Sequence, residues 1–127
     1  MEWRTTSMQF KLHVNGIVVI TPPEDFAGPE TLEHAIENIE SRNEYAEGKL
    51  KAVLAHLPNH YVNTAATKYY KQETPDVPIA LVGDSAFKTM IGNFMLKLVR
   101  PGRPIKLFTE EADAMTWLEQ ELGITNP

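Results

Sequence analysis

Apolar and polar residues alternate near the start of the chain, with the period of two that is typical of a β-strand. The alternation runs from Phe10 to Val14, and Asn15-Gly16 then supplies the pair that a two-residue type I′ turn requires. Residues 17–20 are apolar at every position, as expected for a strand that is covered on both faces. The pattern therefore predicts a β-hairpin over residues 9–20.

The spacing changes to a helical period over residues 30–47. Leu32, Ile36 and Ile39 recur on one side and predict the buried stripe of a helix. A run of glutamates that begins with Glu30 occupies many of the remaining positions. Such a charge run is typical of a solvated helix face, so we expect these carboxylates, including that of Glu30, to point into water.

Short apolar runs and helical segments then alternate to the end of the chain. Asn63 or Thr64 is expected to cap the first of these helices, and Thr109 the last. The predicted strands are 51–57, 79–82 and 105–108, and the predicted helices are 64–72, 86–99 and a final helix that ends near Leu122.

This order, β-β-α-β-α-β-α-β-α, predicts one α/β domain over residues 1–127. Strands that alternate with helices after a hairpin favour a mixed, largely parallel sheet with helices packed on it. We therefore expect a five-stranded sheet with an N-terminal β-hairpin and four main helices. The length of 127 residues fits a single domain of this kind.

The composition argues against several classes of function. The chain has no cysteine, which removes disulfides, thiolate nucleophiles and zinc–cysteine sites. Its net charge of −5 disfavours general nucleic-acid binding. No phosphate-binding loop, dinucleotide fingerprint or nucleophile elbow is present. His56 and His60 are four residues apart, but Pro58 lies between them, so we predict no metal site. We also predict no cofactor and no catalytic residue.

The 25 residues from Ser85 to Thr109 contain five cations and no acid, which gives this window +5 and the rest of the chain −10. The window includes the most apolar helical stretch, 86–99, whose apolar residues cover more than half of the helix circumference. One sheet cannot bury so broad an arc, and the nearby cations favour an apolar, anionic partner. We expect apolar contact from Phe87, Met90, Phe94, Met95, Leu96 and Val99, and contact with phosphate headgroups from Lys97, Arg100 and Arg103.

Two interpretations of this helix stay open at this point. In the first, it attaches reversibly to an anionic membrane and helps to bind a lipid or another apolar or amphipathic small molecule. In the second, it is a homodimer face or docks a regulatory protein. A ligand pocket beside the helix could be lined by Phe26, Tyr61, Tyr69, Tyr70, Phe87, Met90, Phe94 and Met95, although ordinary core packing also accounts for each of them.

Three blocks of sequence resemble the SpoIIAA-like family. They are Ile79-Ala-Leu-Val-Gly-Asp84, Arg103-Pro-Ile-Lys-Leu-Phe108 and Glu111-Ala-Asp-Ala-Met-Thr-Trp-Leu118, the last of which looks like the closing Ala-x-x-Trp-Leu signature of that family. The resemblance covers about residues 8–122. The family is related to the STAS domain and shares its architecture with the CRAL-TRIO lipid-binding domain. The resemblance therefore implies the same α/β fold.

The resemblance also implies one candidate modification site. In STAS regulators a D-S-S-G motif opens a helix, and its second serine is phosphorylated. The motif falls here on Asn63-Thr64-Ala65-Ala66, so Ala65 replaces that serine. Thr64 is the remaining phospho-acceptor, and capping of the helix is its alternative role.

Taken together, the sequence favours a non-enzymatic binding module rather than an enzyme. The first eight residues lack the apolar core of a signal peptide, and no apolar run is long enough to cross a bilayer. We therefore expect a cytoplasmic protein that can lie peripherally at the inner face of the membrane.

Overall fold

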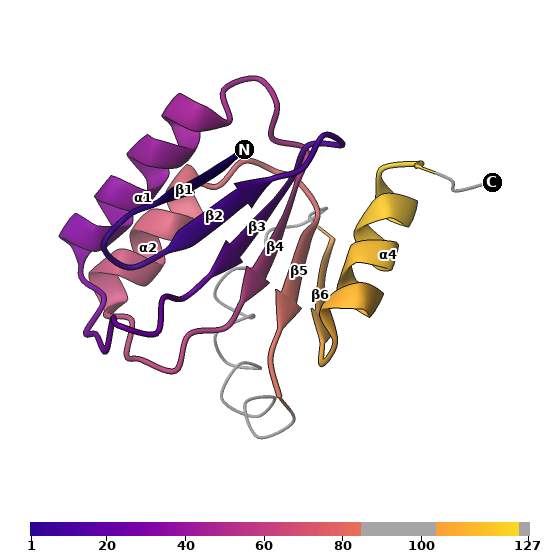
Figure 1. Ribbon diagram of the computed structural model, residues 1–127. Coiled ribbons are helices and arrows are strands. Elements are labelled where there is room, and N and C mark those ends of the chain that lie inside the picture. Colours follow the sequence, from indigo (N-terminus) through magenta and orange to yellow (C-terminus); the bar gives the residue numbers. More distant parts are fainter. Residues whose placement is uncertain (85–103, 125–127) are drawn as a thin grey trace.

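One mixed β-sheet forms the centre of the molecule (Figure 1). The computed structural model describes residues 1–84 and 104–124. In this part of the chain the sheet has six strands in the order β1-β2-β3-β4-β5-β6 rather than the five that the sequence predicts. The strands are β1 (Glu2–Arg4), β2 (Gln9–Leu12), β3 (Ile17–Thr21), β4 (Ala52–His56), β5 (Ile79–Val82) and β6 (Ile105–Phe108).

The sixth strand is β1, an edge strand that the sequence pattern does not reveal. It pairs antiparallel with β2 and places Trp3 opposite Phe10. The two rings stack with their centroids 4.9 Å apart, and Trp3 Nε1 donates a hydrogen bond to Ser41 Oγ at 3.1 Å. Three residues are too few to establish a period, so the strand is identified by its pairing with β2 and by these contacts of Trp3.

The hairpin between β2 and β3 is confirmed, but its predicted turn is wrong. A type I′ turn requires positive φ at both central residues, and among the described residues only glycines have positive φ. Gly16 adopts φ +87°, and its N–H donates to the carbonyl of His13 at 3.0 Å. His13 N–H also donates to the carbonyl of Ile17 at 3.0 Å, so the loop beyond this pair has three residues, Val14 to Gly16. Val14 is fully exposed instead of continuing the strand.

The sheet is antiparallel from β1 to β3 and parallel from β3 to β6. This confirms a mixed sheet in which the later strands are parallel. The parallel strands read as apolar runs because both faces are covered: Ile17 and Val18 in β3 are both fully buried although they point to opposite faces.

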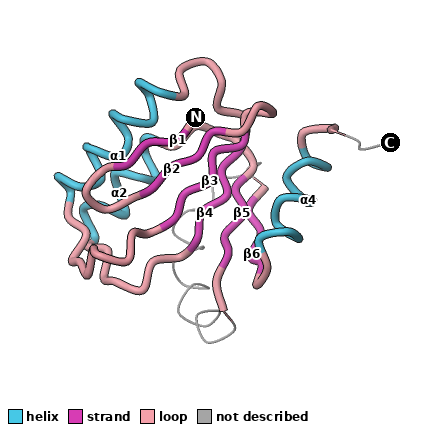
Figure 2. Tube along the Cα trace, in the orientation of Figure 1, coloured by secondary structure: helices cyan, strands magenta, loops and turns pink. Residues whose placement is uncertain are grey.

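Three helices lie within the described residues: α1 (Leu32–Tyr45), α2 (Thr64–Glu73) and α4 (Glu111–Glu121). Figures 1 and 2 show α1 and α2 together on one side of the sheet and α4 on the other. The predicted helix 86–99 lies outside the described residues. None of the helices in residues 1–84 and 104–124 is long and apolar enough to cross a membrane.

The stripe that helix α1 buries shares only Ile39 with the one predicted. Leu32 is 36% exposed and Ile36 is half-buried, whereas Ala35, Asn38, Ile39 and Arg42 are buried. The reason is that α1 packs against α2 as well as the sheet, and polar groups of the two helices bond to each other. The helix also begins two residues later than predicted, with Thr31 as its N-cap.

Each face of the sheet has its own apolar core. In the core under α4, Met115, Trp117 and Leu122 pack around the buried Leu118. Glu110 rather than Thr109 is the N-cap of this helix. The buried members of this core are Ile17, Val19, Ala52, Leu54, Ala80, Val82, Ala114 and Leu118. On the side of α1 and α2, the buried apolar residues of the sheet are Phe10, Val18, Val53, Ile79 and Leu81.

Candidate functional site

A cavity of about 150 Å³ lies between the sheet and the pair α1–α2, and we call it the helix-side cavity. Its walls are mostly apolar. The sheet contributes residues such as Val53, Ala55, Ile79 and Leu81. Helices α1 and α2 and the loops beside them contribute a ridge of polar side chains. The polar residues of the lining are Ser7, Glu30, Asn38, Arg42, His56, His60, Tyr70 and Thr74.

Glu30 is the central residue of that ridge, with only 1% of its surface exposed. Its backbone explains its position, because Glu30 forms an isolated parallel bridge with Val62. The N–H of Glu30 donates to the carbonyl of Tyr61 at 2.8 Å, and its own carbonyl accepts from Asn63 N–H at 3.0 Å. These bonds fix Glu30 just before α1 and direct it inward. The expectation that this carboxylate is a solvated helix residue is therefore wrong.

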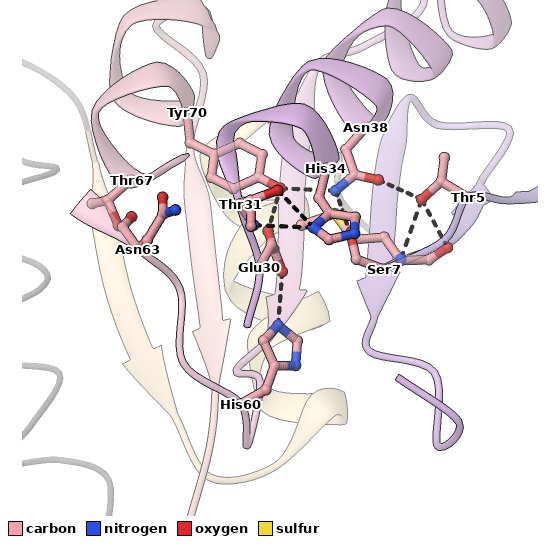
Figure 3. Close-up of polar contacts among 11 residues, drawn as sticks. Thr5, Ser7, Glu30, Thr31, His34, Asn38, His60, Asn63, Thr67 and Tyr70 are labelled. Carbon is pink, nitrogen blue, oxygen red and sulfur yellow. Dashed lines mark hydrogen bonds and ion pairs between the residues drawn. The ribbon is translucent and has the colours of Figure 1, made fainter. Parts of the chain in front are cut away.

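The Glu30 carboxylate has two partners from distant parts of the chain (Figure 3). His60 Nε2 lies 2.7 Å from Oε1, and the Tyr70 hydroxyl donates to Oε2. The side chains of His60 and Glu30 are 4% and 2% exposed. A buried carboxylate is tolerated only when it is paired and hydrogen-bonded, and both of its oxygens meet that requirement here.

The network continues from Tyr70 to the start of the chain. Asn38 Nδ2 donates to the Tyr70 hydroxyl and to Ser7 Oγ, both at 2.8 Å, and Thr5 Oγ1 donates to Asn38 Oδ1. Burial, with the charge of Glu30, raises the pKa of Tyr70 well above its ordinary value, so the phenol stays protonated. We call Glu30, His60, Tyr70, Asn38 and Ser7 the Glu30 cluster.

The loop before Glu30 packs on His60 and holds it against the carboxylate. The ring of Phe26 meets the rings of His34 and His60 edge to face, with centroids 5.0 and 4.9 Å away. Gly28 passes so close to His60 that an added Cβ would lie 2.8 Å from the Cβ of His60. His34 also receives the backbone N–H of Thr31 at 3.0 Å, which joins the cap of α1 to this packing. His34 therefore has a local structural role.

Most of the residues predicted to bind a partner lie outside the described residues. These are Phe87, Met90, Phe94, Met95, Leu96, Lys97, Val99, Arg100 and Arg103. Of the other aromatic candidates, Tyr70 lines the cavity, Phe26 lies behind His60, and Tyr61 is 67% exposed. Tyr69 does not contribute to the described lining.

The two histidines that the sequence places four residues apart have different partners. His60 contacts Glu30 on the helix side, whereas His56 Nε2 lies 2.7 Å from Glu111 Oε1 at the start of α4. Within residues 1–84 and 104–124, no group of three or more histidine and carboxylate side chains could hold a metal ion. Asn63 is the N-cap of α2, since its side chain accepts from Ala66 N–H at 2.8 Å, and Thr64 is the exposed first residue of that helix.

Sequence reasoning missed the residues that the structure brings together. Asn38 and Arg42 lie one turn apart on one face of α1, and Glu30 lies just before the helix. All three are polar or charged, so the sequence pattern predicts that they are exposed to solvent. The available signal was Gly28-Pro29 just before Glu30, a turn that can aim the next residue inward. The resulting site offers hydrogen-bonding groups and one buried cation beside an apolar space, an arrangement that suits recognition of a small molecule.

Comparison with known proteins shows the family but no closer relative. Searches of curated proteins and of solved structures each found no match. The sequence does match a family described as a domain of unknown function (DUF7793), and it does so over residues 10–122. The match covers every lining residue of the helix-side cavity except Ser7 and Met8. The chain therefore belongs to the DUF7793 family.

Proposed function

We propose that this protein is a non-enzymatic binding module that holds a small apolar or amphipathic molecule in the helix-side cavity. The observation that supports the proposal best is the cavity itself, with a volume of about 150 Å³ and mostly apolar walls. An engineered apolar cavity of about this volume binds benzene. The preferred ligand is therefore of the size of one aromatic ring or a short hydrocarbon chain.

The Glu30 cluster supports the same proposal because it gives the apolar space a polar side. Binding sites for small molecules combine apolar walls with a few fixed polar groups that set the orientation of the ligand. Here both carboxylate oxygens of Glu30 are engaged, so the cluster is held in place before a ligand arrives. A preorganised wall costs little ordering entropy on binding.

A titration with benzene, followed by two-dimensional NMR, tests this function. We expect saturable shifts of the methyl signals of Val53, Leu81 and Ile39, which line the cavity. Ala55→Leu adds bulk to the cavity wall and should abolish these shifts. Ala65→Leu is the matched control, because Ala65 is exposed on α2. Absence of saturable shifts in the wild type, or equal shifts in Ala55→Leu, would contradict the proposal.

Peripheral membrane attachment through residues 86–99 is a second proposal, and the sequence alone supports it. The window 85–109 holds five cations and no acid, and each cation near an anionic surface contributes about 1 kcal/mol. Co-sedimentation with anionic vesicles should fall in the variant Lys97→Glu/Arg100→Glu, while the exposed control Lys68→Glu should bind normally. Equal binding to neutral and anionic vesicles would contradict it.

A protein-interaction role for the same segment is the alternative. The SpoIIAA-like resemblance supports it, since STAS-type domains dock regulatory partners, and it also keeps Thr64 as a proposed phospho-acceptor. Light scattering separates the two ideas: a stable dimer that dissociates on Leu96→Asp, without vesicle binding, would favour an interface. In either case we propose a cytoplasmic location.

A further inference from the structure

Arg42 lies in the wall of the helix-side cavity with 5% of its surface exposed. Its Nη2 donates to the backbone carbonyl of Glu73 at 2.9 Å and, at a longer 3.4 Å, to Asn43 Oδ1. Its Nε is buried without a hydrogen-bond partner in the described part of the chain. A buried donor left unpaired is unfavourable, so a ligand that supplies an acceptor there would gain free energy of binding.

Arg42 also has no close ion-pair partner among the described residues. Across residues 1–84 and 104–124, no carboxylate lies within ion-pair distance of its guanidinium. Residues 85–103 contain neither aspartate nor glutamate, so they hold no side-chain carboxylate that could neutralise it. Burial lowers the pKa of Arg42, and the charge of Glu73 opposes this from beyond ion-pair distance. An anion in the cavity would compensate this buried cation.

We propose that the helix-side cavity takes a small apolar monocarboxylate, with its carboxylate on Arg42 and its hydrocarbon part against Val53 and Leu81. This inference rests on the proposed binding function and specifies its ligand class. The planar guanidinium presents Nε–H and an Nη–H in parallel, which is the geometry that a carboxylate accepts. The cavity volume of about 150 Å³ limits the hydrocarbon part to about one aromatic ring.

The other groups around the cavity are consistent with a single anion site at Arg42. The Glu30 carboxylate already uses both oxygens and would repel a second carboxylate, so the ligand's charged end is directed away from it. Asn38 lies one helical turn before Arg42, and its side-chain amide donates its hydrogen bonds to Tyr70 and Ser7. Among the described residues, Arg42 Nε is the buried side-chain atom without a hydrogen-bond partner.

Benzoate and benzamide form the probe pair, because they share size and shape and differ in charge. We expect the wild type to bind benzoate at least tenfold more tightly than benzamide, as a charge-assisted hydrogen bond implies. Benzoate should also shift the Arg42 Nε–Hε signal in the NMR spectrum. Arg42→Met should reduce benzoate affinity about tenfold or more and reduce benzamide affinity much less, because the amide oxygen accepts only a neutral hydrogen bond from the guanidinium. Arg42→Lys keeps the positive charge but loses the pair of parallel N–H donors, so its benzoate affinity should lie between those of the wild type and Arg42→Met.

The outcomes separate this inference from the function on which it rests. Equal affinity for benzoate and benzamide in the wild type would overturn the inference and leave the apolar pocket intact; Arg42 would then serve only to cap α2 through Glu73. Binding of neither probe would overturn the inference, and the benzene titration would then decide separately whether the cavity binds an apolar molecule. If Arg42→Met fails to fold, the wild-type comparison and the Arg42 Nε–Hε signal still decide the matter.

Discussion

The hydroxyl of Tyr70 donates a hydrogen bond to Oε2 of Glu30, across 40 residues of sequence. The bond joins the middle of α2 to the segment that leads into α1. Asn38 on α1 donates to the same hydroxyl at 2.8 Å, so one phenol ties together both helices and the strand-like segment at Glu30. The polar wall of the helix-side cavity depends on this junction.

Replacement of Tyr70 by phenylalanine should destabilise the protein by about 1–3 kcal/mol, because it leaves a carboxylate oxygen of Glu30 and an amide hydrogen of Asn38 unpaired in a buried place. Urea unfolding at neutral pH measures the change. Tyr61→Phe is the control, since Tyr61 is 67% exposed, and it should alter the free energy of unfolding by less than about 0.5 kcal/mol. Equal effects of the two substitutions would show that the junction contributes nothing.

The same residue should make the protein sensitive to alkali. Burial and the charge of Glu30 raise the pKa of Tyr70 in the folded state, whereas in the unfolded chain a tyrosine has a pKa of about 10. Above about pH 10 the unfolded chain therefore releases a proton that the folded protein keeps, and the free energy of unfolding falls as pH rises. Below that pH the contribution of Tyr70 does not change with pH.

Urea unfolding of the wild type and Tyr70→Phe from pH 8 to about 11 tests this prediction. The difference between the two proteins should be constant up to about pH 10 and should then narrow as pH rises. Lysines titrate in the same range, but both proteins contain the same lysines. Their contribution to the free energy of unfolding therefore cancels in the difference between the two proteins. Stability curves that stay parallel to pH 11 would contradict the assigned pKa shift.

Two histidine–glutamate pairs in this protein provide a matched test of burial. His60–Glu30 and His56–Glu111 both have a nitrogen–oxygen distance of 2.7 Å, but the first pair is 4% and 2% exposed and the second 28% and 52%. A double-mutant cycle to glutamine should give a coupling energy of about 0.5–3 kcal/mol for the buried pair. For the exposed pair we expect about 0–1 kcal/mol.

Each single substitution adds a separate check. His60→Gln leaves a buried carboxylate without one partner and should be far more destabilising than His56→Gln, whose partner Glu111 is open to water. High salt should weaken the exposed pair and change the buried one little. Equal coupling energies in the two cycles would mean that burial does not strengthen the interaction.

Much of the fold could be predicted from the sequence because parallel strands covered on both faces read as continuous apolar runs. The predicted strands 79–82 and 105–108 are confirmed to the residue. The strand predicted at 51–57 is shorter by one residue at each end, Ala52–His56. Strand β1 was not predicted, because three residues are too few to show the alternation that identifies a strand.

The candidate site could not be predicted, and Glu30 shows why. By local spacing it is one of several glutamates on a helix, and the others nearby, such as Glu33 and Glu37, are exposed as expected. Its burial depends on His60 and Tyr70, which lie 30 and 40 residues away in the chain. No local period carries information about partners at that distance. Tyr70 lines the helix-side cavity, whereas the pocket predicted from the sequence lay beside residues 86–99, outside the described part of the chain.

The packing of the loop before Glu30 leads to a last prediction, about Gly28. Its φ is +83°, and an added Cβ would lie 2.8 Å from the Cβ of His60. Gly28→Ala should therefore strain the backbone and displace His60 from Glu30. Gly48 is the matched control, because its φ is +71° but an added Cβ would meet nothing within 4 Å. Gly48→Ala then reports backbone strain alone, about 1–2 kcal/mol.

We expect Gly28→Ala to cost about 1–3 kcal/mol more than Gly48→Ala, because overpacking adds to the backbone strain. Urea unfolding of both variants measures the difference. The displacement of His60 should also appear in the NMR spectrum as a shift of its ring signals, which Gly48→Ala should leave in place. If both substitutions lower the free energy of unfolding equally and the His60 signals do not move, then the loop shifts to accommodate the added methyl group. Close packing against Gly28 would in that case not be what holds His60 beside the Glu30 carboxylate.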